Sequence, residues 1–432
     1  MAPRFKIFSD PVHGFISVPR QLIFDLIQTP EVQRLRRIRQ LGVGYLVFPG
    51  AEHTRFGHAL GATALMQDAV NHLAEKGTPI SREEALAAQA VALLHDLGHG
   101  PFSHTLEHEL IADFHHEHMS RRMLVDLNAR FGGALDMALA IFDGTYARPF
   151  FHQLISSQLD MDRLDYLRRD TFYAGVAEGA IGVQRLIKTM RVDPLEGGPN
   201  SRIVIEAKGI YAVENFVLAR RLMYWQVYLH KTVLAGDHLL RAIIRRVRWH
   251  LGEERGASLD GCARNFLFFL EHRLTGADIH RDDVLEQYRT LDDSDVLFSI
   301  KQWMHHDDPV LRDLSRRFIE RDFFRVAYLG EAPTPDQLAA WQQVVADGLV
   351  QRGLSHRDTA WHDAASYLHL DTSRHAAYAA SRDSIAILDR DGTIRELSVS
   401  ADAHGMDALT AKEERTYLCY PKFVQLDLPL VA

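Results

Sequence analysis

Apolar residues recur at helical spacing along most of the chain, which predicts a mainly α-helical fold. This periodicity is clear over residues 21–40, 52–76 and 85–94. Pro30 fits the first turn of a helix, and Ser81 with Glu84 three residues later has the spacing of a capping box. Further helices are expected at residues 105–111, 116–130, 134–142, 151–169 and 211–249.

Strand signals are confined to a few short segments. Residues 5–20 combine turn signals with short apolar runs, which predicts strand and turn. A loop is expected at residues 192–201 and a short strand at 202–207. Residues 384–388 and 393–399 alternate around Asp-Arg-Asp-Gly, which predicts a hairpin.

A change of pattern divides the chain into two parts. Helical periodicity continues to about residue 329, and residues 330–335 carry the Gly and Pro signals of a linker. We therefore expect a large helical domain over residues 1–330 and a small α+β lobe over residues 336–432.

Composition limits the class of protein. The 432 residues include 47% hydrophobic and 25% charged residues, as in a folded globular chain. There is no uninterrupted apolar run of about 18 residues and no signal-peptide pattern, so no membrane partner is expected. Two distant cysteines, Cys262 and Cys419, fit a reducing cytoplasm. The net charge of −8 disfavours a broad nucleic-acid surface but permits a local basic pocket.

The pair His95-Asp96 is the first candidate for chemistry. An isolated pair of this kind is usually a core histidine beside a capping acid. Here the pair ends an apolar helix, and His99 and His104 follow within nine residues, separated by glycines that allow tight turns. Imidazole and carboxylate ligands suit Fe, Mn, Zn, Co or Ni, and carboxylates also accept Mg. A divalent metal site is therefore expected.

Other helices carry residues that complete such a site. His58 lies on the preceding predicted helix. Asp162, Tyr166 and Asp170 are spaced i, i+4 and i+8 on a later one, so they share a face. The alternative is a solvated helix of acids and arginines.

Long ordered motifs then connect the chain to a known family. They are Asp10-Pro-Val-His-Gly, Thr29-Pro-Glu-Val-Gln-Arg-Leu-Arg, Gln40-Leu-Gly-Val-Gly-Tyr, Arg55-Phe-Gly-His-Ala-Leu-Gly, His95-Asp-Leu-Gly-His-Gly-Pro-Phe-Ser-His, Asp162-Arg-Leu-Asp-Tyr-Leu-Arg-Arg-Asp, Tyr228-Leu-His-Lys and Leu291-Asp-Asp-Ser-Asp. Together they resemble the HD-domain deoxynucleoside triphosphate (dNTP) triphosphohydrolases over about residues 5–330. The resemblance implies a mainly α HD phosphohydrolase core that converts a dNTP and water to deoxynucleoside and inorganic triphosphate.

The resemblance also implies roles for individual residues. The metal ligands would be His58, His95, Asp96 and Asp162. His104 and His116 would be the acid–base pair, with His115 or His118 as alternatives to His116. Glu107 would orient His104, although the family usually has Asp there, and His99 would contact phosphate.

Substrate contacts follow from the same motifs. Arg55 and Lys231 would hold the triphosphate, Tyr166 and Tyr228 would enclose the sugar and base, and Asp170 would bind the 3′-hydroxyl. Gln40 and Leu41 would close on the sugar. Arg220, Tyr224, Tyr228 and Lys231 fall at spacings of one helical face, a pattern that core packing also produces.

The chain departs from the family at a regulatory position. Gln28 stands where an acid of vertebrate relatives reads guanine, and a neutral amide cannot replace a carboxylate that accepts two donors. Gln33 and Arg36 of that motif are kept, so another nucleotide regulator is possible. Gly57 replaces a frequent Glu. Family likeness favours a homo-oligomer.

Two other functions fit parts of the sequence. One is a different HD-family phosphohydrolase or phosphodiesterase, although the Gly-Tyr-Pro extension of cyclic-dinucleotide enzymes is absent. The other is a non-enzymatic binder of nucleotides or single-stranded nucleic acid, which is possible but not favoured. It would use the basic clusters at residues 34–39 and at Arg241, Arg245, Arg246 and Arg248. Charged faces of this kind are normally solvated.

Overall fold

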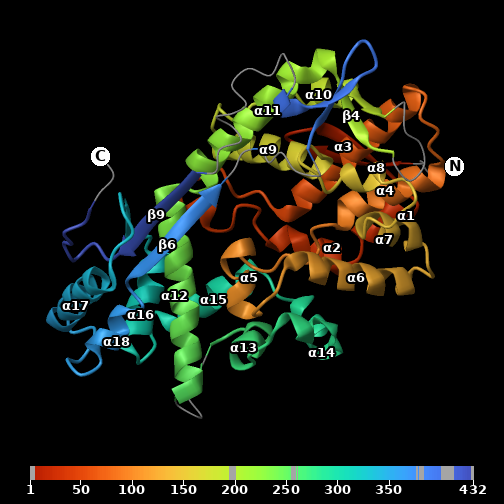
Figure 1. Cartoon of the computed structure of the whole chain (residues 1–432). Coiled ribbons are helices and arrows are strands. Elements are labelled where there is room, and N and C mark those ends of the chain that lie inside the picture. The colour runs from red at the N-terminus through yellow and green to blue at the C-terminus, as the bar shows by residue number, and fades with distance from the viewer. Residues whose placement is uncertain are drawn as a thin grey trace.

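The fold was analysed in a computed structural model that describes residues 5–193, 201–253, 259, 261–375, 378, 384–399 and 413–429. The fold is mainly α, as predicted, and consists of a large helical core with a small α+β lobe. Figure 1 shows the long helix α12 (Lys231–Glu253) between the two parts, with the lobe strands β6 (His369–His375) and β9 (Glu413–Tyr420) beside it.

The chain begins with the predicted strands and turn. Strands β1 (Phe5–Asp10) and β2 (Gly14–Pro19) form an antiparallel hairpin, and Gly14 adopts a φ of +75° at the turn. Residues 21–40, where the sequence predicts helix, form three short elements: α1 (Leu22–Ile27), α2 (Pro30–Arg34) and the 3₁₀ turn η1 (Leu35–Arg37). A second 3₁₀ turn, η2 (Gly42–Leu46), follows.

The core helices follow in chain order. They are α3 (Arg55–Glu75), α4 (Arg82–Leu94), η3 (Ser103–Thr105), α5 (Glu107–Leu110), α6 (His116–Arg130), α7 (Asp136–Phe142), α8 (Phe150–Gln153) and α9 (Met161–Ala174). The capping box at the start of α4 is confirmed, because Ser81 Oγ accepts from Glu84 N and Glu84 accepts from Ser81 N. Helix α3 starts three residues later than predicted, since Thr54 pairs with Arg39 in a β-bridge.

The helix predicted over residues 151–169 is wrong, because the structure has two helices there. Helix α8 ends at Gln153, and the side chain of Asp160 accepts a hydrogen bond from Arg163 N to cap the start of α9. A local N-cap therefore overrides the apolar periodicity across residues 154–160. The helix predicted over 105–111 is similarly reduced to a 3₁₀ turn and one turn of α-helix.

The middle of the chain contains the next group of elements. They are α10 (Val183–Thr189), β3 (Met190–Val192), β4 (Ile203–Glu206), η5 (Ala207–Gly209), α11 (Ile210–Met223), the π-helical turn η6 (Tyr224–Tyr228), α12, α13 (Arg264–Glu271), η7 (Gly276–His280), α14 (Asp282–Tyr288), α15 (Asp293–Trp303) and α16 (Pro309–Ile319). Residues 194–200 of the predicted loop lie outside the described residues.

The prediction of one helix over residues 211–249 is wrong. The π-helical turn η6 interrupts it, and α12 restarts at Lys231 after His230 Nδ1 accepts from Thr232 N at 3.2 Å. A π-turn takes an extra residue and shifts the side chains that follow it around the axis. The four positions expected on one helical face therefore do not share one.

The last part of the chain forms the lobe. Its elements are β5 (Arg325–Tyr328), α17 (Pro335–Gln351), α18 (Ala360–Ala364), β6 (His369–His375), β7 (Ala386–Leu388), β8 (Ile394–Glu396), η8 (Leu397–Val399) and β9 (Glu413–Tyr420). The β7–β8 hairpin is confirmed, with Gly392 at a φ of +89° in its turn.

Two strands within residues 1–330, the part expected to form the helical domain, pair with strands of residues 336–432. Strand β5, which replaces the helix expected up to residue 329, pairs with β9, and β9 pairs with β6. Strand β4 pairs in parallel with β7. The two parts thus share two of the three described sheets, and the boundary at residues 330–335 stays a prediction.

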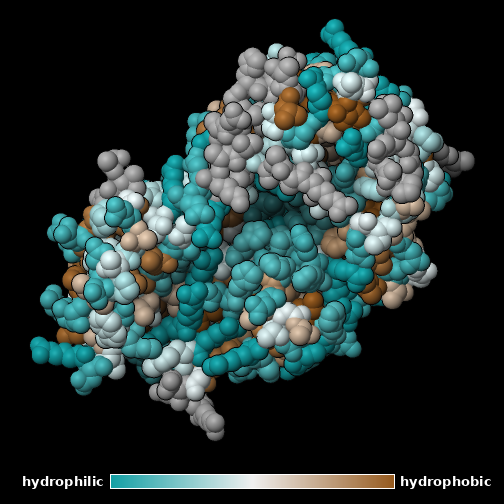
Figure 2. Space-filling model, viewed as in Figure 1, coloured by the Kyte–Doolittle hydropathy of each residue, from teal (hydrophilic) through white to brown (hydrophobic). Residues whose placement is uncertain are grey.

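Helices α3 and α4 lie at the centre of the core, and several of their side chains are fully buried, such as Leu73 and Val91. Helix α9 packs on α3, so the segments that carry the candidate ligands are brought together by the core itself. On the face shown in Figure 2, hydrophilic residues surround a hollow near the centre. Among the described helices, none is both long and apolar enough to span a bilayer.

Candidate metal centre and active-site pocket

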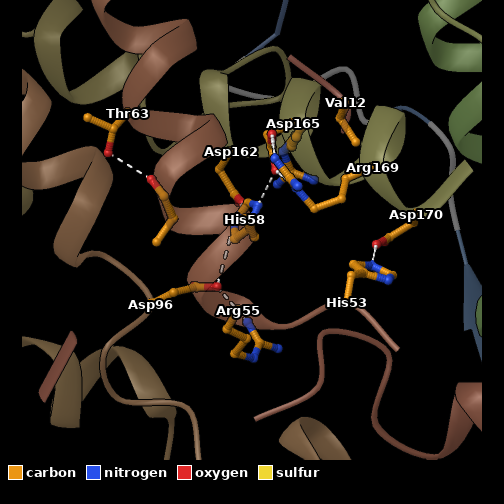
Figure 3. A network of polar contacts seen from close by, with 12 residues as sticks. Val12, His53, Arg55, His58, Thr63, Asp96, Asp162, Asp165, Arg169 and Asp170 are labelled. Atoms are coloured by element: carbon orange, nitrogen blue, oxygen red, sulfur yellow. Dashed lines mark hydrogen bonds and ion pairs between the residues drawn. The ribbon is translucent and has the colours of Figure 1, made fainter. Parts of the chain in front are cut away.

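Four side chains from three helical segments meet at one point. Helix α3 supplies His58, the end of α4 supplies His95 and Asp96, and α9 supplies Asp162. His58 Nε2 lies 3.0 Å from Asp162 Oδ1, and His95 Nε2 lies 3.4 Å from the same oxygen. One oxygen of Asp96 lies 3.3 Å from His95 Nε2. The other lies 3.7 Å from His58 Nε2 (Figure 3). The structure thus brings the four predicted ligands together.

The orientation of both rings fits a metal ion. His58 Nδ1 lies 2.7 Å from Asp165 Oδ2, and His95 Nδ1 lies 2.9 Å from the carbonyl oxygen of Ala92. These partners hold the proton on Nδ1 and leave Nε2 as the ligand atom. Both Nε2 atoms are buried without a hydrogen-bond partner among the described residues. Two such nitrogens facing two carboxylates are the donor set of a transition-metal site.

The electrostatics of the four side chains also favour a bound cation. Burial lowers the pKa of His58, but the carboxylates of Asp162 and Asp165 outweigh it and raise the pKa to about 10. Burial raises the pKa of Asp162, yet His58 and His95 together hold it below its usual range. The site therefore attracts positive charge strongly, and a divalent cation can replace the proton between these groups.

A buried network of ion pairs contacts the Nδ1 side of the His58 ring, opposite its candidate ligand atom. Asp165 accepts hydrogen bonds from Arg169 Nε at 2.9 Å and lies 2.6 Å from His13 Nε2. Arg169 also donates to Asp10 at 2.8 Å. A Cβ atom at Gly61 would lie 1.8 Å from Asp165 Oδ1, so glycine at this position lets α3 and α9 approach. The resulting network fixes the ring of His58.

A second group of side chains surrounds Glu107. His104 Nδ1 lies 3.1 Å and His116 Nδ1 lies 3.2 Å from Glu107 Oε2. The rings of His99 and His116 stack with centroids 3.7 Å apart. Burial raises the pKa of Glu107, but the two histidines outweigh it and hold the pKa well below its usual range. One ionised carboxylate therefore orients both predicted acid–base histidines.

The three candidate histidines of residues 115–118 lie in different environments. His116 is among the residues that line the pocket, with its side chain 20% exposed. The His115 side chain is 68% exposed and packs near His108, while His118 lines a different cavity. Position thus separates His116 from its neighbours.

The loop that carries His104 is held in an uncommon conformation. Phe102 and Ser103 adopt φ angles of +52° and +46°. The carboxylate of Asp293 accepts from Phe102 N and from Arg39 N, each at 2.9 Å. Arg34, which is fully buried, donates to the carbonyl oxygens of Leu97, His99 and Leu291. These contacts stabilise the strained turn.

The metal centre opens into a cavity of about 370 Å³. This volume lies in the range of small-molecule sites. Its lining residues come from both the N-terminal motifs and α12: Gln40, Leu41, Gly42, Gly44, Arg55, Asp96, His99, Phe102, Ser103, His104, Thr105, His116, Asp162, Tyr166, Asp170, Tyr224, Val227, Tyr228, Val233 and Asp237.

Asp170 lies at the aromatic end of the cavity. It accepts a hydrogen bond from the Tyr228 hydroxyl at 2.8 Å and lies 2.7 Å from His53 Nε2. Tyr166 and Tyr224 lie beside Tyr228, with ring centroids 6.4 and 5.1 Å away. At the metal end, Arg55 pairs with Asp96 and donates to Ser103 Oγ at 2.8 Å. The cavity therefore joins an end that contains Arg55 and the candidate metal ligands Asp96 and Asp162 to an end that contains Asp170 and the three tyrosines.

Two predicted substrate residues lie away from the lining. Lys231 is exposed, and its Nζ lies 4.8 Å from the centroid of the Tyr328 ring. Arg220 lies with its guanidinium carbon 5.9 Å from the Tyr224 ring centroid. The break in the helix at η6 explains why Lys231, which follows it, is not on the cavity wall with Tyr224 and Tyr228.

Sequence reasoning missed several supporting residues. Asp165, Arg169 and His53 hold His58 and Asp170 in place, and Asp237 lines the cavity. Asp165 and Arg169 stand in the quoted Asp162 motif, so the i, i+4 pair they form was a readable signal. Spacing gives no such signal for His53, because it contacts Asp170 across 117 positions.

Comparisons with known proteins agree with this geometry. Residues 55–169 match the HD domain model, and residues 181–254 match the HD associated region. The chain is 36% identical to the uncharacterized protein YwfO of Bacillus subtilis over 437 residues, covering 96% of this chain and 92% of that protein. It is 31% identical to the deoxynucleoside triphosphate triphosphohydrolase SAMHD1 of Gallus gallus, covering 52% of this chain and 43% of that enzyme.

A solved structure extends the match to nearly the whole chain. A phosphohydrolase from Bacteroides thetaiotaomicron superimposes with a TM-score of 0.89 at 40% identity, covering 97% of this chain and 100% of that chain. The fold is therefore shared with this phosphohydrolase over nearly the whole chain.

Proposed function

The chain belongs to the HD-domain phosphohydrolase family that includes the SAMHD1 enzymes, and we propose that it hydrolyses dNTPs to deoxynucleosides and inorganic triphosphate. One observation carries the proposal: a single cavity joins the candidate metal centre to the Asp170–Tyr228 pair. The first end suits a triphosphate, and the second suits a sugar hydroxyl beneath a base. HD domains are metal-dependent hydrolases, so the ligand set fits a cation whose identity is open.

The metal end supports cleavage at the α-phosphorus. His58, His95, Asp96 and Asp162 would hold a divalent cation, and its positive charge would offset the charge that develops on the phosphate oxygens. Arg55, whose guanidinium lies beside Asp96, adds a second positive charge for the triphosphate. His99, whose pKa is lowered by burial and by Arg55, stays neutral and can contact phosphate without repelling the cation.

The proton transfers are assigned to the histidines around Glu107. Water attacks the α-phosphorus and loses a proton, the bond to O5′ breaks, and O5′ gains a proton. His104 and His116 are within reach of the cavity and are oriented through Nδ1 by the same carboxylate. Each can therefore present Nε2 to the reacting atoms, one as acid and the other as base.

The sugar end supports recognition of a deoxyribose. Asp170 is held between His53 and Tyr228, which fixes its oxygens at the cavity wall where a 3′-hydroxyl can donate. Gln40 and Leu41 line the same cavity, and Gln40 Oε1 is buried with no hydrogen-bond partner in the described part of the chain. A buried unpaired oxygen is available to a substrate donor.

Internal contacts of the basic clusters argue against a nucleic-acid surface. Arg34 is fully buried, Arg37 pairs with Asp292, and Arg246 pairs with Asp308 and Asp363. Arg245 pairs with Glu109, and Arg248 donates to two backbone carbonyls. Most of these charges therefore stabilise the fold and are already compensated.

Product analysis tests the proposal. Metal-reconstituted protein is incubated with each dNTP alone and in pairs, and the products are separated by anion-exchange chromatography. Deoxynucleoside with inorganic triphosphate supports the proposal, whereas pyrophosphate with a nucleoside monophosphate contradicts it. A His95→Ala, Asp96→Ala double variant should lose turnover, and unchanged hydrolysis by that variant would also contradict it.

A further inference from the structure

Glu107 lies at the centre of a second cluster of metal-ligand side chains. One ligand atom from each of His99, His104, Glu107 and His116 can be chosen so that all four lie within 4.8 Å of one another. The contacts of Glu107 Oε2 with Nδ1 of His104 and of His116 are 3.1 and 3.2 Å. None of these four residues belongs to the proposed ligand set of the HD centre.

These separations match the edges of a small coordination sphere. Ligand atoms bound tetrahedrally at 2.0–2.1 Å lie about 3.3 Å apart. The two contacts of Glu107 already have that length, so an ion could be inserted with small ring movements. The fourth ligand, His99, needs a larger movement, because its ring now stacks on His116 at an interplanar angle of 20°.

His99 offers a nitrogen that lacks a partner. The residue is 3% exposed, and its Nδ1 has no hydrogen-bond partner among the residues that the structure describes. Its Nε2 lies 3.4 Å from Asp96 Oδ1. A buried imidazole with one engaged and one unpaired nitrogen is poised to bind a cation through the unpaired atom.

Solvent reaches the cluster from one side. The His104 side chain is 72% exposed, and Glu107, His108 and His115 form a further group of potential ligands beside it. An ion arriving from solvent would therefore meet several imidazoles before it reaches Glu107. This exposure gives the cluster an entry path.

We propose that Glu107, His104, His116 and His99 form a second, inhibitory site for a transition-metal ion such as Zn²⁺. Three imidazoles and one carboxylate favour Zn²⁺, Co²⁺ or Ni²⁺ over Mg²⁺, which prefers oxygen ligands. The inhibitory consequence rests on the proposed function. An imidazole bound to an ion through Nδ1 keeps its proton on Nε2 and cannot accept another, so it cannot complete an acid–base cycle.

Metal counting tests the site without any substrate. Metal-free full-length protein is titrated with Zn²⁺ against a chromophoric chelator, and bound metal is counted after gel filtration. Wild type should bind two equivalents. A His104→Ala, His116→Ala variant and a Glu107→Gln variant should each bind one, and His95→Ala, Asp96→Ala should retain the second site.

A matched control variant and a Co²⁺ absorption spectrum show whether the second equivalent of metal binds at the proposed cluster. His118→Ala removes an exposed histidine of the same helix that is outside the cluster, and it should still bind two equivalents. Circular dichroism verifies that each variant is folded. Titration with Co²⁺ should give a second set of visible absorption bands in wild type that His104→Ala, His116→Ala lacks. One equivalent in wild type, or a second equivalent retained by His104→Ala, His116→Ala, would overturn the proposal.

Activity then separates this site from the proposed function. With Mn²⁺ in the HD centre, excess Zn²⁺ should lower wild-type turnover at least tenfold, and a weak chelator should restore it. Full turnover with both sites loaded would overturn the inhibitory role. Failure to hydrolyse any dNTP would refute the proposed function but would leave the metal count as the independent test of the second site.

Discussion

Asp165 Oδ2 lies 2.7 Å from His58 Nδ1, and this contact turns the opposite nitrogen of the ring toward Asp96 and Asp162. Both residues are fully buried, and Asp165 is itself held by Arg169 (Figure 3). We therefore expect the metal affinity of the candidate centre to depend on Asp165, which is not one of the proposed ligands.

Asp165→Asn should weaken metal binding at the HD centre by about 10–100-fold, as for other partners of ligand histidines. An amide cannot hold the imidazole proton as a carboxylate does. Competition with a chelator measures the affinity. Asp282→Asn, which removes a highly exposed acid paired with Arg122, is the control and should bind metal like wild type. Equal affinity of Asp165→Asn and wild type would show that the contact is not needed.

Asp170→Asn should reduce kcat/KM for dNTPs by about 10–100-fold and should reduce it much less for 2′,3′-dideoxynucleotides. The reason is that a carboxylate accepts from a 3′-hydroxyl that the dideoxy analogue lacks. Steady-state kinetics of wild type and variant on both substrates form a double-mutant cycle. Equal losses on both substrates would remove Asp170 from sugar recognition.

Asp293→Asn should lower kcat by about tenfold or more while metal content stays unchanged. The carboxylate accepts from the backbone of Phe102 and Arg39, and an amide can accept only through its oxygen. Release of the turn would displace His104, and small misplacements of reacting groups are costly. Asp295→Asn, on the same helix but bound to Asn265, is the matched control. A variant with normal kcat would show that the turn holds without this clamp.

Asp308→Asn should lower the thermal midpoint at pH 7, and the difference from wild type should shrink as the pH falls below about 4. Burial raises the pKa of Asp308, but hydrogen bonds from Arg246 and His250 outweigh it and hold it well below its usual range. A carboxyl with a lowered folded-state pKa stabilises the fold above its unfolded pKa, and this contribution is lost as pH falls through the folded value. Removing one partner of a buried ion pair costs about 3 kcal/mol.

Thermal unfolding followed by circular dichroism at pH 7, 3.5 and 2 checks this expectation. Asp283→Asn breaks an exposed pair with Arg281 and should leave the midpoint nearly unchanged at each pH. A constant difference between Asp308→Asn and wild type at all three pH values would contradict the assignment.

The sequence predicted those parts of the fold that depend on local signals. The capping box of Ser81, the limits of α6 and the β7–β8 hairpin follow from spacing and turn chemistry, and the structure confirms them. The prediction of helix limits was wrong where an N-cap or the extra residue of a π-turn interrupts the apolar periodicity, as at Asp160 and at Tyr224–Tyr228. Strand β5 was missed because four residues acquire strand structure only by pairing with distant β9.

The residues of the candidate site were likewise only partly predictable from the sequence. His95, Asp96 and Asp162 stand in long motifs, so they were found, and the structure brings them together with His58. His53 and Asp293 act through contacts that span more than 100 positions, and such contacts leave no periodic trace in one sequence. The family resemblance predicted Lys231 at the substrate, and its spacing from Tyr228 agreed only for a continuous helix, which the π-turn interrupts.

The most direct test of the central claim is hydrolysis of dNTPs in H₂¹⁸O by metal-reconstituted protein, with the products analysed by mass spectrometry. Attack at the α-phosphorus predicts inorganic triphosphate that carries one ¹⁸O atom and a deoxynucleoside that carries none. Labelled pyrophosphate, labelled monophosphate or a labelled deoxynucleoside would contradict the account.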